Sequence, residues 1–182
     1  MVSFLCETSR RSARVSFYLR HCVLYTNINK SAIIESNTIM EKINMKTIIL
    51  YYSWSGKTKA LAVKKAGEIG ADIEEITEVK RPSGFGAFFV GAPKALKRKT
   101  VNIKPIVVDL KFYDQIIVMA PVWASYPAPA FNNIVEAIPS GKKVEIIMIS
   151  ASGGTKKSAE GTKKLFTDKG CEVAGYTDIT EK

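Results

Sequence analysis

The sequence predicts an α/β fold built on a parallel β-sheet, and three observations support this prediction. From residue 45 onward, apolar runs that fit buried strands alternate with amphipathic stretches that fit helices. The apolar runs are rich in Ile and Val, as expected for strands covered on both faces. Gly or Pro stands near several of the changes from one pattern to the next. A chain of 182 residues with these features has room for one such domain.

The first strand and the first helix have the clearest pattern. Residues 46–52 are almost continuously apolar, which favours a strand. Residues 57–69 follow with helical periodicity, and Gly70 is the expected C-terminal cap. Four positions are predicted to form the buried side of this helix: Ala62, Val63, Ala66 and Ile69.

A second strand is predicted at residues 72–77. The crossover from 78 to 114 is rich in Gly, Pro and Lys and contains one short helix near residues 87–96. Residues 115–120 form the third predicted strand. These segments continue the alternation of strands and helices that a parallel sheet requires.

The last part of the chain repeats the pattern. Pro129 opens a helix in which Phe131, Ile134, Val135 and Ile138 share one face. The remaining predicted elements are a fourth strand at 143–150, a helix at about 156–169 and a final strand near 172–178.

Residues 1–44 differ in kind from the rest. They show neither strand nor helix periodicity, and they hold six basic residues, three acidic residues and the only histidine, His21. We expect this extension to be disordered or to reflect a start codon placed too far upstream, because Met40 and Met45 lie just before the first strand. A targeting segment, as the arginines near the N-terminus suggest, or a partner-binding tail are the alternatives. Residues 45–182 form the predicted folded domain.

The composition excludes several kinds of site. The three cysteines are scattered, and after residue 44 there is one cysteine and no histidine. Ser-His-Asp triads, Cys-His dyads and His-based zinc sites are therefore excluded, and we expect no metal and no catalytic side chain. No apolar run approaches the ~20 residues of a membrane span. A reducing, cytoplasmic setting fits these features best.

A polar loop follows the first strand in the segment YYSWSGKT, residues 51–58. Gly-Lys-Thr suggests a triphosphate loop, but that motif needs Gly at its first position, where Tyr51 stands. The hydroxyls of Ser53, Ser55 and Thr58 at a helix start would instead suit one phosphate group. A plain N-cap by Ser55 is the structural alternative.

Two later loops are expected at the same edge of the sheet. Pro121 and Trp123 directly follow the third strand, and an indole there offers a flat stacking surface. Ser152, Gly153 and Gly154 follow the fourth strand. Each of these features also has a structural interpretation, as a core anchor or as a tight connection.

The Ser-x-Ser-Gly-x-Thr loop and the segment APVWASYPAPAF resemble the flavin-binding loops of the flavodoxin family. The resemblance covers residues 45–182 and implies a three-layer α/β/α fold, a five-stranded sheet in the order 2-1-3-4-5, and FMN as cofactor. The residues that it implies for FMN are Ser53, Trp54, Ser55, Gly56, Lys57, Thr58, Pro121, Val122, Trp123, Ala124, Tyr126, Ser152, Gly153 and Gly154.

Two features depart from the family pattern. After residue 44 there are 21 lysines and arginines against 14 aspartates and glutamates, whereas flavodoxins are usually acidic. No segment after the last predicted strand matches the C-terminal helix of the family, so we expect residues 32–43 or a second subunit of a homodimer to cover one face of the sheet. The basic cluster formed by Lys94, Lys97, Arg98 and Lys99 has no recognition motif, so we expect a solvated surface and no nucleic acid.

These observations predict an FMN-binding electron carrier that serves redox partner proteins, with acidic partners favoured by the charge. The first alternative is an NAD(P)H-dependent flavin or quinone oxidoreductase, in which residues 78–114 would help to form a substrate pocket. The second is a flavodoxin-like interaction module without a cofactor.

Overall fold

The computed structural model describes residues 45–80, 86–151 and 154–180. Within them lies one sheet in which five parallel strands follow the order β2-β1-β3-β5-β6, and a short sixth strand, β4, pairs antiparallel with β3. The predicted order 2-1-3-4-5 is therefore confirmed for the five parallel strands. Their bounds are β2 Asp72–Glu75, β1 Thr47–Tyr51, β3 Gln115–Trp123, β5 Lys143–Ser150 and β6 Glu172–Thr180, with β4 at Tyr126–Pro127.

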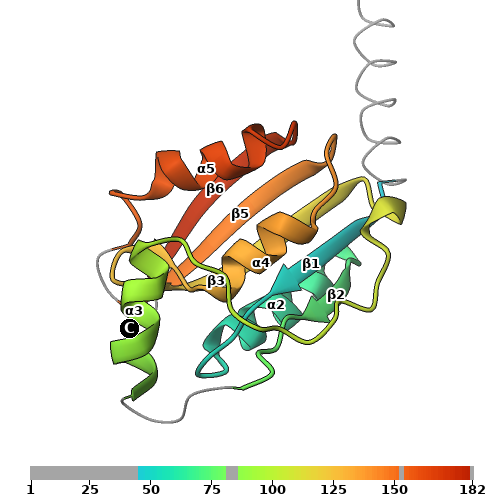
Figure 1. Cartoon of the computed structure of the whole chain (residues 1–182). Coiled ribbons are helices and arrows are strands. Elements are labelled where there is room, and N and C mark those ends of the chain that lie inside the picture. Colours follow the sequence, from blue (N-terminus) through green and yellow to red (C-terminus); the bar gives the residue numbers. More distant parts are fainter. Residues whose placement is uncertain (1–44, 81–85, 152–153, 181–182) are drawn as a thin grey trace, which may run out of the picture. The chain divides into compact units, whose positions relative to one another are not determined.

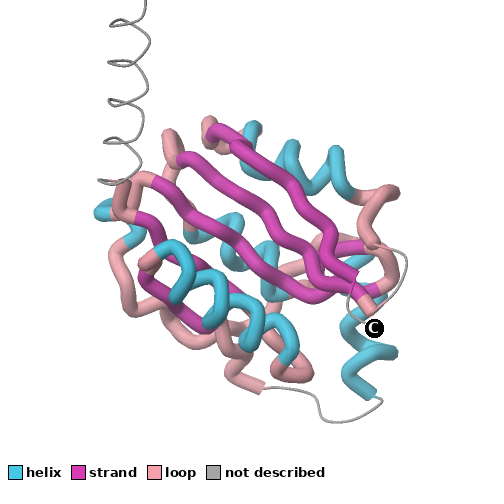
Figure 2. The backbone as a smooth tube through the Cα atoms, turned by 180° about the vertical axis from the view of Figure 1, so that it is seen from behind, coloured by secondary structure: helices cyan, strands magenta, loops and turns pink. Residues whose placement is uncertain are grey.

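Helices lie on both faces of this sheet (Figure 1). On one face, α4 (Ala130–Ala137) and α5 (Ala159–Thr167) pack near a large apolar cluster that includes Phe131, Ile134 and Phe166. On the other face, which is turned toward the viewer in Figure 2, α2 (Lys57–Ile69) covers a smaller apolar cluster. Successive strand residues alternate between the two clusters, so the central strands are buried on both sides, as predicted.

The bounds of α2 match the prediction, and its buried side matches in part, since Ala62 and Ala66 are buried but Val63 and Ile69 are not. Thr58, Ala62 and Ala66 are buried, whereas Val63 is 54% exposed and Ile69 is 49% exposed. The buried residues are four positions apart and form a single ridge of small side chains. This ridge allows close packing on the sheet, and it turns Val63 and Ile69 toward solvent.

The third strand is longer than predicted, because β3 continues through Pro121 and Val122 to Trp123. Trp123 then pairs with Tyr126 across a two-residue turn in which Ala124 (φ 51°) and Ser125 (φ 68°) are both left-handed. Two positive φ values are the mark of a type I′ hairpin turn. The sequence has Ala-Ser in place of the usual Asn-Gly, which is why β4 was not predicted.

The helix α3 (Gly86–Leu96) lies where a short helix was predicted, at one end of the sheet (Figure 1). A 3-10 helix at Leu110–Phe112 precedes β3. The helix α5 is shorter than predicted, because residues 156–158 form turns before it, and β6 is longer by two residues. The last two differences shift boundaries only and leave the topology unchanged.

A groove of about 260 Å³ runs beside α2 over β3, β5 and β6. An ion pair of 3.1 Å between Lys65 Nζ of α2 and Glu145 Oε1 of β5 crosses it. Ile147 and Ile149 on this face are buried nonetheless. The expectation that residues 32–43 or a second subunit cover this face stays a prediction, since residues 1–44 lie outside the described part.

Candidate functional site

A cavity of about 140 Å³ lies at the carboxyl ends of β1, β3 and β5. In open α/β sheets this is the edge where ligands bind, next to the switch point between β1 and β3. Ligand pockets usually enclose about 300 Å³ or more, so a drug-sized ligand bound here would extend beyond the cavity toward solvent. The lining residues are Trp54, Ser55, Lys57, Thr58, Pro121, Val122, Trp123, Ile149, Ser150 and Ala151.

The first loop is folded around the side chain of Ser53. The Ser53 hydroxyl oxygen accepts hydrogen bonds from the backbone N–H of Gly56 (3.1 Å) and of Lys59 (3.2 Å), and the residue is only 6% exposed. Gly56 is the N-cap of α2 with φ 91°, and it has no side chain to cap the helix. Ser53 therefore takes the capping role that the alternative interpretation gave to Ser55.

Ser55, Lys57 and Thr58 are the polar groups that this loop presents to the cavity. Ser55 and Lys57 are exposed, whereas Thr58 is 2% exposed in the first turn of α2. The first turn of a helix has backbone N–H groups without intrahelical acceptors, and the helix dipole adds positive potential. Two hydroxyls, an ammonium group and a helix N-terminus form a donor set that suits an anion such as a phosphate monoester.

The structure argues against a triphosphate-binding loop after β1. Tyr51, at the position of the missing first glycine, is the last residue of β1 and pairs with Met119 and Glu75 in the parallel ladders. The backbone at this position is extended, and the Tyr51 hydroxyl donates to Glu75 at 2.9 Å. The chain turns only after β1 ends, so the longer triphosphate-binding loop does not form.

Two tryptophans meet at the cavity. The rings of Trp54 and Trp123 are 5.6 Å apart with an interplanar angle of 80°, which is an edge-to-face contact. Tyr52 approaches the Trp123 ring in a similar way at 6.3 Å, and its hydroxyl donates to Glu78 at 2.7 Å. On another side, Gly91 of α3 lies so close that an added Cβ would be 2.2 Å from the indole. Trp123 is thus held by neighbours on several sides.

The hairpin turn after Trp123 is held by residues from outside it. Ser158 Oγ donates to the carbonyl of Ser125 at 2.6 Å. Arg98 stacks over the ring of Tyr126 at 5.5 Å and donates to the Ser158 carbonyl at 3.3 Å. Burial lowers the pKa of Arg98, with the nearby Tyr126 acting in the opposite direction. Tyr126 therefore faces Arg98 and does not line the cavity.

The turn after β5 is anchored to the edge strand β6. Thr155 is fully buried, and its hydroxyl lies 2.6 and 2.8 Å from the carboxylate oxygens of Asp178 and 2.5 Å from the hydroxyl of Tyr176. The Thr155 backbone N–H also donates to Asp178 at 3.1 Å, and burial raises the pKa of Tyr176. Gly154 has φ 57°, a conformation that favours Gly.

The cavity brings together seven of the predicted residues: Trp54, Ser55, Lys57, Thr58, Pro121, Val122 and Trp123. Ser53 and Gly56 shape the loop, whereas Ala124, Tyr126 and Gly154 do not line the cavity. Ser152 and Gly153 lie outside the described residues. The prediction omitted Ile149, Ser150 and Ala151, although their position at the end of a predicted strand was a signal for them.

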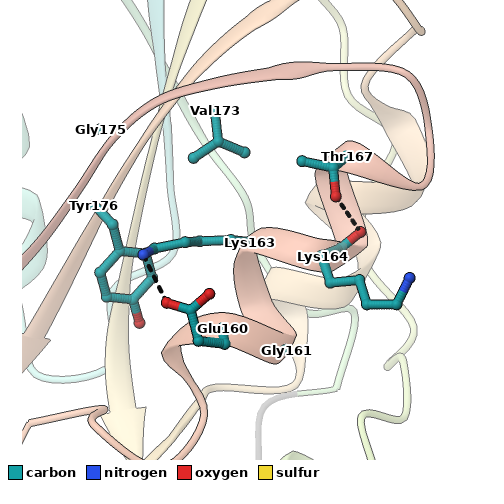
Figure 3. A pocket seen from close by; sticks show the side chains of 8 residues that line it. All are labelled: Glu160, Gly161, Lys163, Lys164, Thr167, Val173, Gly175 and Tyr176. Carbon is teal, nitrogen blue, oxygen red and sulfur yellow. Dashed lines mark hydrogen bonds and ion pairs between the residues drawn. The ribbon is translucent and has the colours of Figure 1, made fainter.

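A larger, open hollow of about 600 Å³ lies between α5 and β6 (Figure 3). Its charged side chains pair with one another or with neighbours. Lys163 donates to Glu160 at 2.9 Å and lies over the ring of Tyr176, and Lys164 donates to Asp168 at 2.6 Å. Because these groups satisfy one another, the hollow offers no convergent donors for a ligand, and we place the site at the smaller cavity.

Two further kinds of site find no support in the part of the chain that the structure describes. It contains no cluster of three or more His, Cys, Asp or Glu side chains that could hold a metal ion. None of its helices has the length and apolar character needed to cross a membrane. The single cysteine there, Cys171, is buried, and its thiol donates to the carbonyl of Pro139 at 3.3 Å.

The structure is similar to solved flavoproteins, although no family model and no curated protein matches the chain. A flavoprotein from Lactobacillus acidophilus, solved in complex with FMN, is 27% identical with a TM-score of 0.62 over 74% of this chain and 93% of that one. Its apo form, solved by NMR, is 26% identical with a TM-score of 0.54 over 75% and 94%. A protein from Bacteroides eggerthii, assigned as a flavoprotein, is 19% identical with a TM-score of 0.66 over 76% and 91%.

These likenesses cover about three quarters of this chain and nearly the whole of each relative. The five parallel strands have the order that defines the flavodoxin-like type of doubly wound sheet. The cavity lies at the edge where that type of sheet binds its ligand. The chain therefore contains a flavodoxin-like α/β domain.

Proposed function

We propose that this chain is an FMN-binding electron carrier of flavodoxin-like fold. The observation that carries the proposal is the meeting of the hydroxyl-bearing start of α2 with two indoles in one cavity at the carboxyl edge of the sheet. The likeness to the Lactobacillus acidophilus flavoprotein, solved with FMN, supports the choice of cofactor.

The loop after β1 would hold the phosphate. Ser55 and Thr58 offer hydroxyl donors, and Lys57 adds a positive charge at the mouth of the cavity. Ser53 fixes the path of the loop from behind, through its bonds to Gly56 and Lys59. The phosphate end of FMN would therefore be bound by groups whose positions are already set before the ligand arrives.

Trp54 and Trp123 would form the aromatic part of the site. Indoles bury large flat surfaces and stack on other flat rings, which suits an isoalloxazine. FMN supplies the redox chemistry when it is bound, and the protein supplies position and electrostatics. Pro121 and Val122 at the end of β3 line the cavity beside the indoles and would add apolar contact to the ring.

An electron carrier needs few reactive side chains of its own, and the chain fits this requirement. After residue 44 the sequence has no histidine and one cysteine, and that thiol is buried. The free thiol also supports a reducing setting such as the cytoplasm. The function would therefore be to pass electrons between redox partner proteins.

The phosphate contact is tested by comparing FMN with riboflavin, which has the same ring and no phosphate. We expect the purified full chain to bind FMN at least tenfold more tightly than riboflavin, because charge-assisted hydrogen bonds contribute about 1.5–3 kcal/mol each. Equal affinity for the two ligands would contradict the assignment of the α2 loop. Lack of binding to either one would contradict the proposal as a whole.

The alternative, an NAD(P)H-dependent flavin or quinone oxidoreductase, is favoured by one observation. The helix α3, from the long crossover, contacts the Trp123 indole through Gly91 and thus lies where a second substrate would enter. NADPH oxidation with a soluble quinone, measured against the same concentration of free FMN, separates the two functions. An electron carrier adds no oxidation beyond that of free FMN, whereas an enzyme multiplies it.

A further inference from the structure

Among the residues that the structure describes, positive charge is concentrated at the end of the sheet that carries the cavity. Exposed lysines surround this end at the start of α2, on the loops after β2 and β5 and on the turn after α3, which lies at the same end in Figure 1. We call this set the basic rim. It consists of Lys57, Lys80, Lys97, Lys99, Lys156 and Lys157.

The carboxylates at the same end are held by neighbouring groups. Glu75 accepts from Lys59 at 3.0 Å and from the Tyr51 hydroxyl, and Glu78 accepts from Tyr52. Asp178 accepts from Thr155. Glu160, in the first turn of α5, pairs with Lys163. These four acids are fewer than the six lysines of the basic rim and Arg98 together, so the local potential is positive.

The opposite end of the sheet is balanced. The residues around the amino ends of the strands include the lysines Lys46, Lys111, Lys142, Lys143 and Lys169 and the acids Asp72, Asp109, Asp114, Glu136, Asp168 and Glu172. Lys142 and Lys169 there donate to backbone carbonyls, at 2.7 to 2.8 Å. The net charge of +10 therefore does not explain the basic rim, because the described part of the chain is polarised along its strands.

We propose that the basic rim is the docking surface for an acidic electron-transfer protein, which would reach the cofactor through the mouth of the cavity. This inference rests on the proposed FMN-binding function, because it places the partner where the ring would be closest to solvent. Complementary charge steers partners into productive orientations and raises association rates by ~10 to 1,000-fold at low salt. The sign of the surface selects acidic partners and repels basic ones.

The first test uses small one-electron oxidants to probe the potential at the cavity mouth. The FMN-loaded full chain is reduced with dithionite and mixed with anionic ferricyanide or cationic hexaammineruthenium(III). Two ions are consumed for each two-electron reduced flavin. Ferricyanide should react faster at low salt and slow as salt shortens the Debye length from about 30 Å at 0.01 M to about 8 Å at 0.15 M. The cationic oxidant should show the opposite dependence.

Matched variants separate the local surface from the net charge. Lys156→Glu/Lys157→Glu reverses two charges on the basic rim, whereas Lys111→Glu/Lys143→Glu makes the same change in net charge at the other end. We expect the rim variant to reduce the ferricyanide rate about tenfold at low salt and the control to change it by less than about twofold. Equal effects of the two variants would overturn the proposal.

The second test does not need the flavin. Polyglutamate is titrated into the isotope-labelled full chain, and the amide shifts are mapped by NMR. Shifts concentrated at Lys57 and at residues 156–157 support the docking surface, and shifts spread over both ends of the sheet contradict it. Equal or tighter binding of single-stranded DNA to the same residues would identify a nucleic-acid surface and also overturn the proposal. Failure to retain FMN would overturn the proposed function and, with it, the electron-transfer role of the partner, whereas the position of the shifts, which this titration also gives on the apo protein, tests the acidic docking surface by itself.

Discussion

Ser53 and Ser55 lie two residues apart in the first loop, yet they have different surroundings. The Ser53 oxygen is bound by two backbone N–H groups and is almost fully buried, whereas Ser55 is exposed at the cavity. Ser53 therefore contributes mainly to the folded structure of the loop. Ser55 is placed to contribute to ligand binding.

This difference gives a paired prediction. Ser53→Ala removes the acceptor for two N–H groups and should lower the free energy of unfolding by ~1 kcal/mol, as loss of a helix cap does. Ser55→Ala should change stability by less than about 0.5 kcal/mol and weaken FMN binding about tenfold. Urea unfolding and FMN titration measure the two effects. A Ser55→Ala protein that binds FMN like the wild type would exclude Ser55 from the site.

At the scale of single residues, much of the cavity could be predicted from the sequence. Ser55, Thr58 and Trp123 line it because each lies at the end of a clearly apolar strand or in the loop and helix start that follow one. The role of Ser53 could not be predicted, since it depends on the left-handed turn at Gly56 that directs two N–H groups back to its oxygen. The position of Tyr126 outside the cavity could not be predicted either, because nothing in the sequence indicates its contact with Arg98.

At the scale of elements, α3 and β3 are packed through a glycine. Gly91→Ala would place a Cβ 2.2 Å from the Trp123 indole, so the helix or the ring must move. We expect this variant to lose ~1–3 kcal/mol of stability and to show altered tryptophan fluorescence. Gly67→Ala in α2 is the matched control, because an added Cβ there has no atom within 4 Å, and it should stabilise by about 0.5–1 kcal/mol. Unchanged fluorescence of Gly91→Ala would contradict the packing.

The turn after β5 is joined to β6 by Thr155 and Asp178. Thr155→Val keeps the shape of the side chain but removes the hydroxyl that the carboxylate of Asp178 and the hydroxyl of Tyr176 share, while the backbone N–H of residue 155 still donates to Asp178. We expect a loss of ~1–3 kcal/mol in the free energy of unfolding and faster amide exchange at Gly154. Thr155→Ser, which retains the hydroxyl, should recover most of the stability. If Thr155→Val unfolded at the same urea concentration as the wild type, the anchor would have no energetic role.

The order of the elements could be predicted from the sequence because the central strands are apolar on both faces and stand out from the helices between them. The hairpin of β3 and β4 could not be predicted, because its turn has Ala124 and Ser125 at positive φ, where Asn or Gly is usual. Contacts from Ser158 and Arg98, distant in sequence, hold this turn. In the buried ridge of α2, the two alanines were predicted, whereas Thr58 was not, since its side chain carries little hydrophobic signal.

At the scale of the whole molecule, stability should fall in alkali. The hydrogen bond from Tyr113 to Asp72 (2.7 Å), together with burial, raises the pKa of Tyr113 to about 12. A tyrosine in the unfolded chain has a pKa of about 10, so the stabilisation is complete below about pH 10 and is lost as the pH rises toward 12. Burial and a hydrogen bond to Glu75 also raise the pKa of Tyr51.

Tyr113→Phe isolates this contribution. At neutral pH it should lower the free energy of unfolding by ~1 kcal/mol, through loss of one hydrogen bond. Between pH 9 and pH 12 its stability should decline less steeply than that of the wild type. Denaturant unfolding at several pH values measures both slopes, and parallel slopes would show that Tyr113 keeps its ordinary pKa.

The central claim, that the cavity binds FMN, is tested most directly by tryptophan fluorescence. The chain contains only two tryptophans, Trp54 and Trp123, and both line the cavity, so the emission reports on the site without labelling. Titration of the apo protein with FMN should quench most of this emission with an end point at one FMN per chain, and the flavin should stay with the protein through gel filtration. Emission that does not change with FMN, together with colourless protein after gel filtration, would contradict the account.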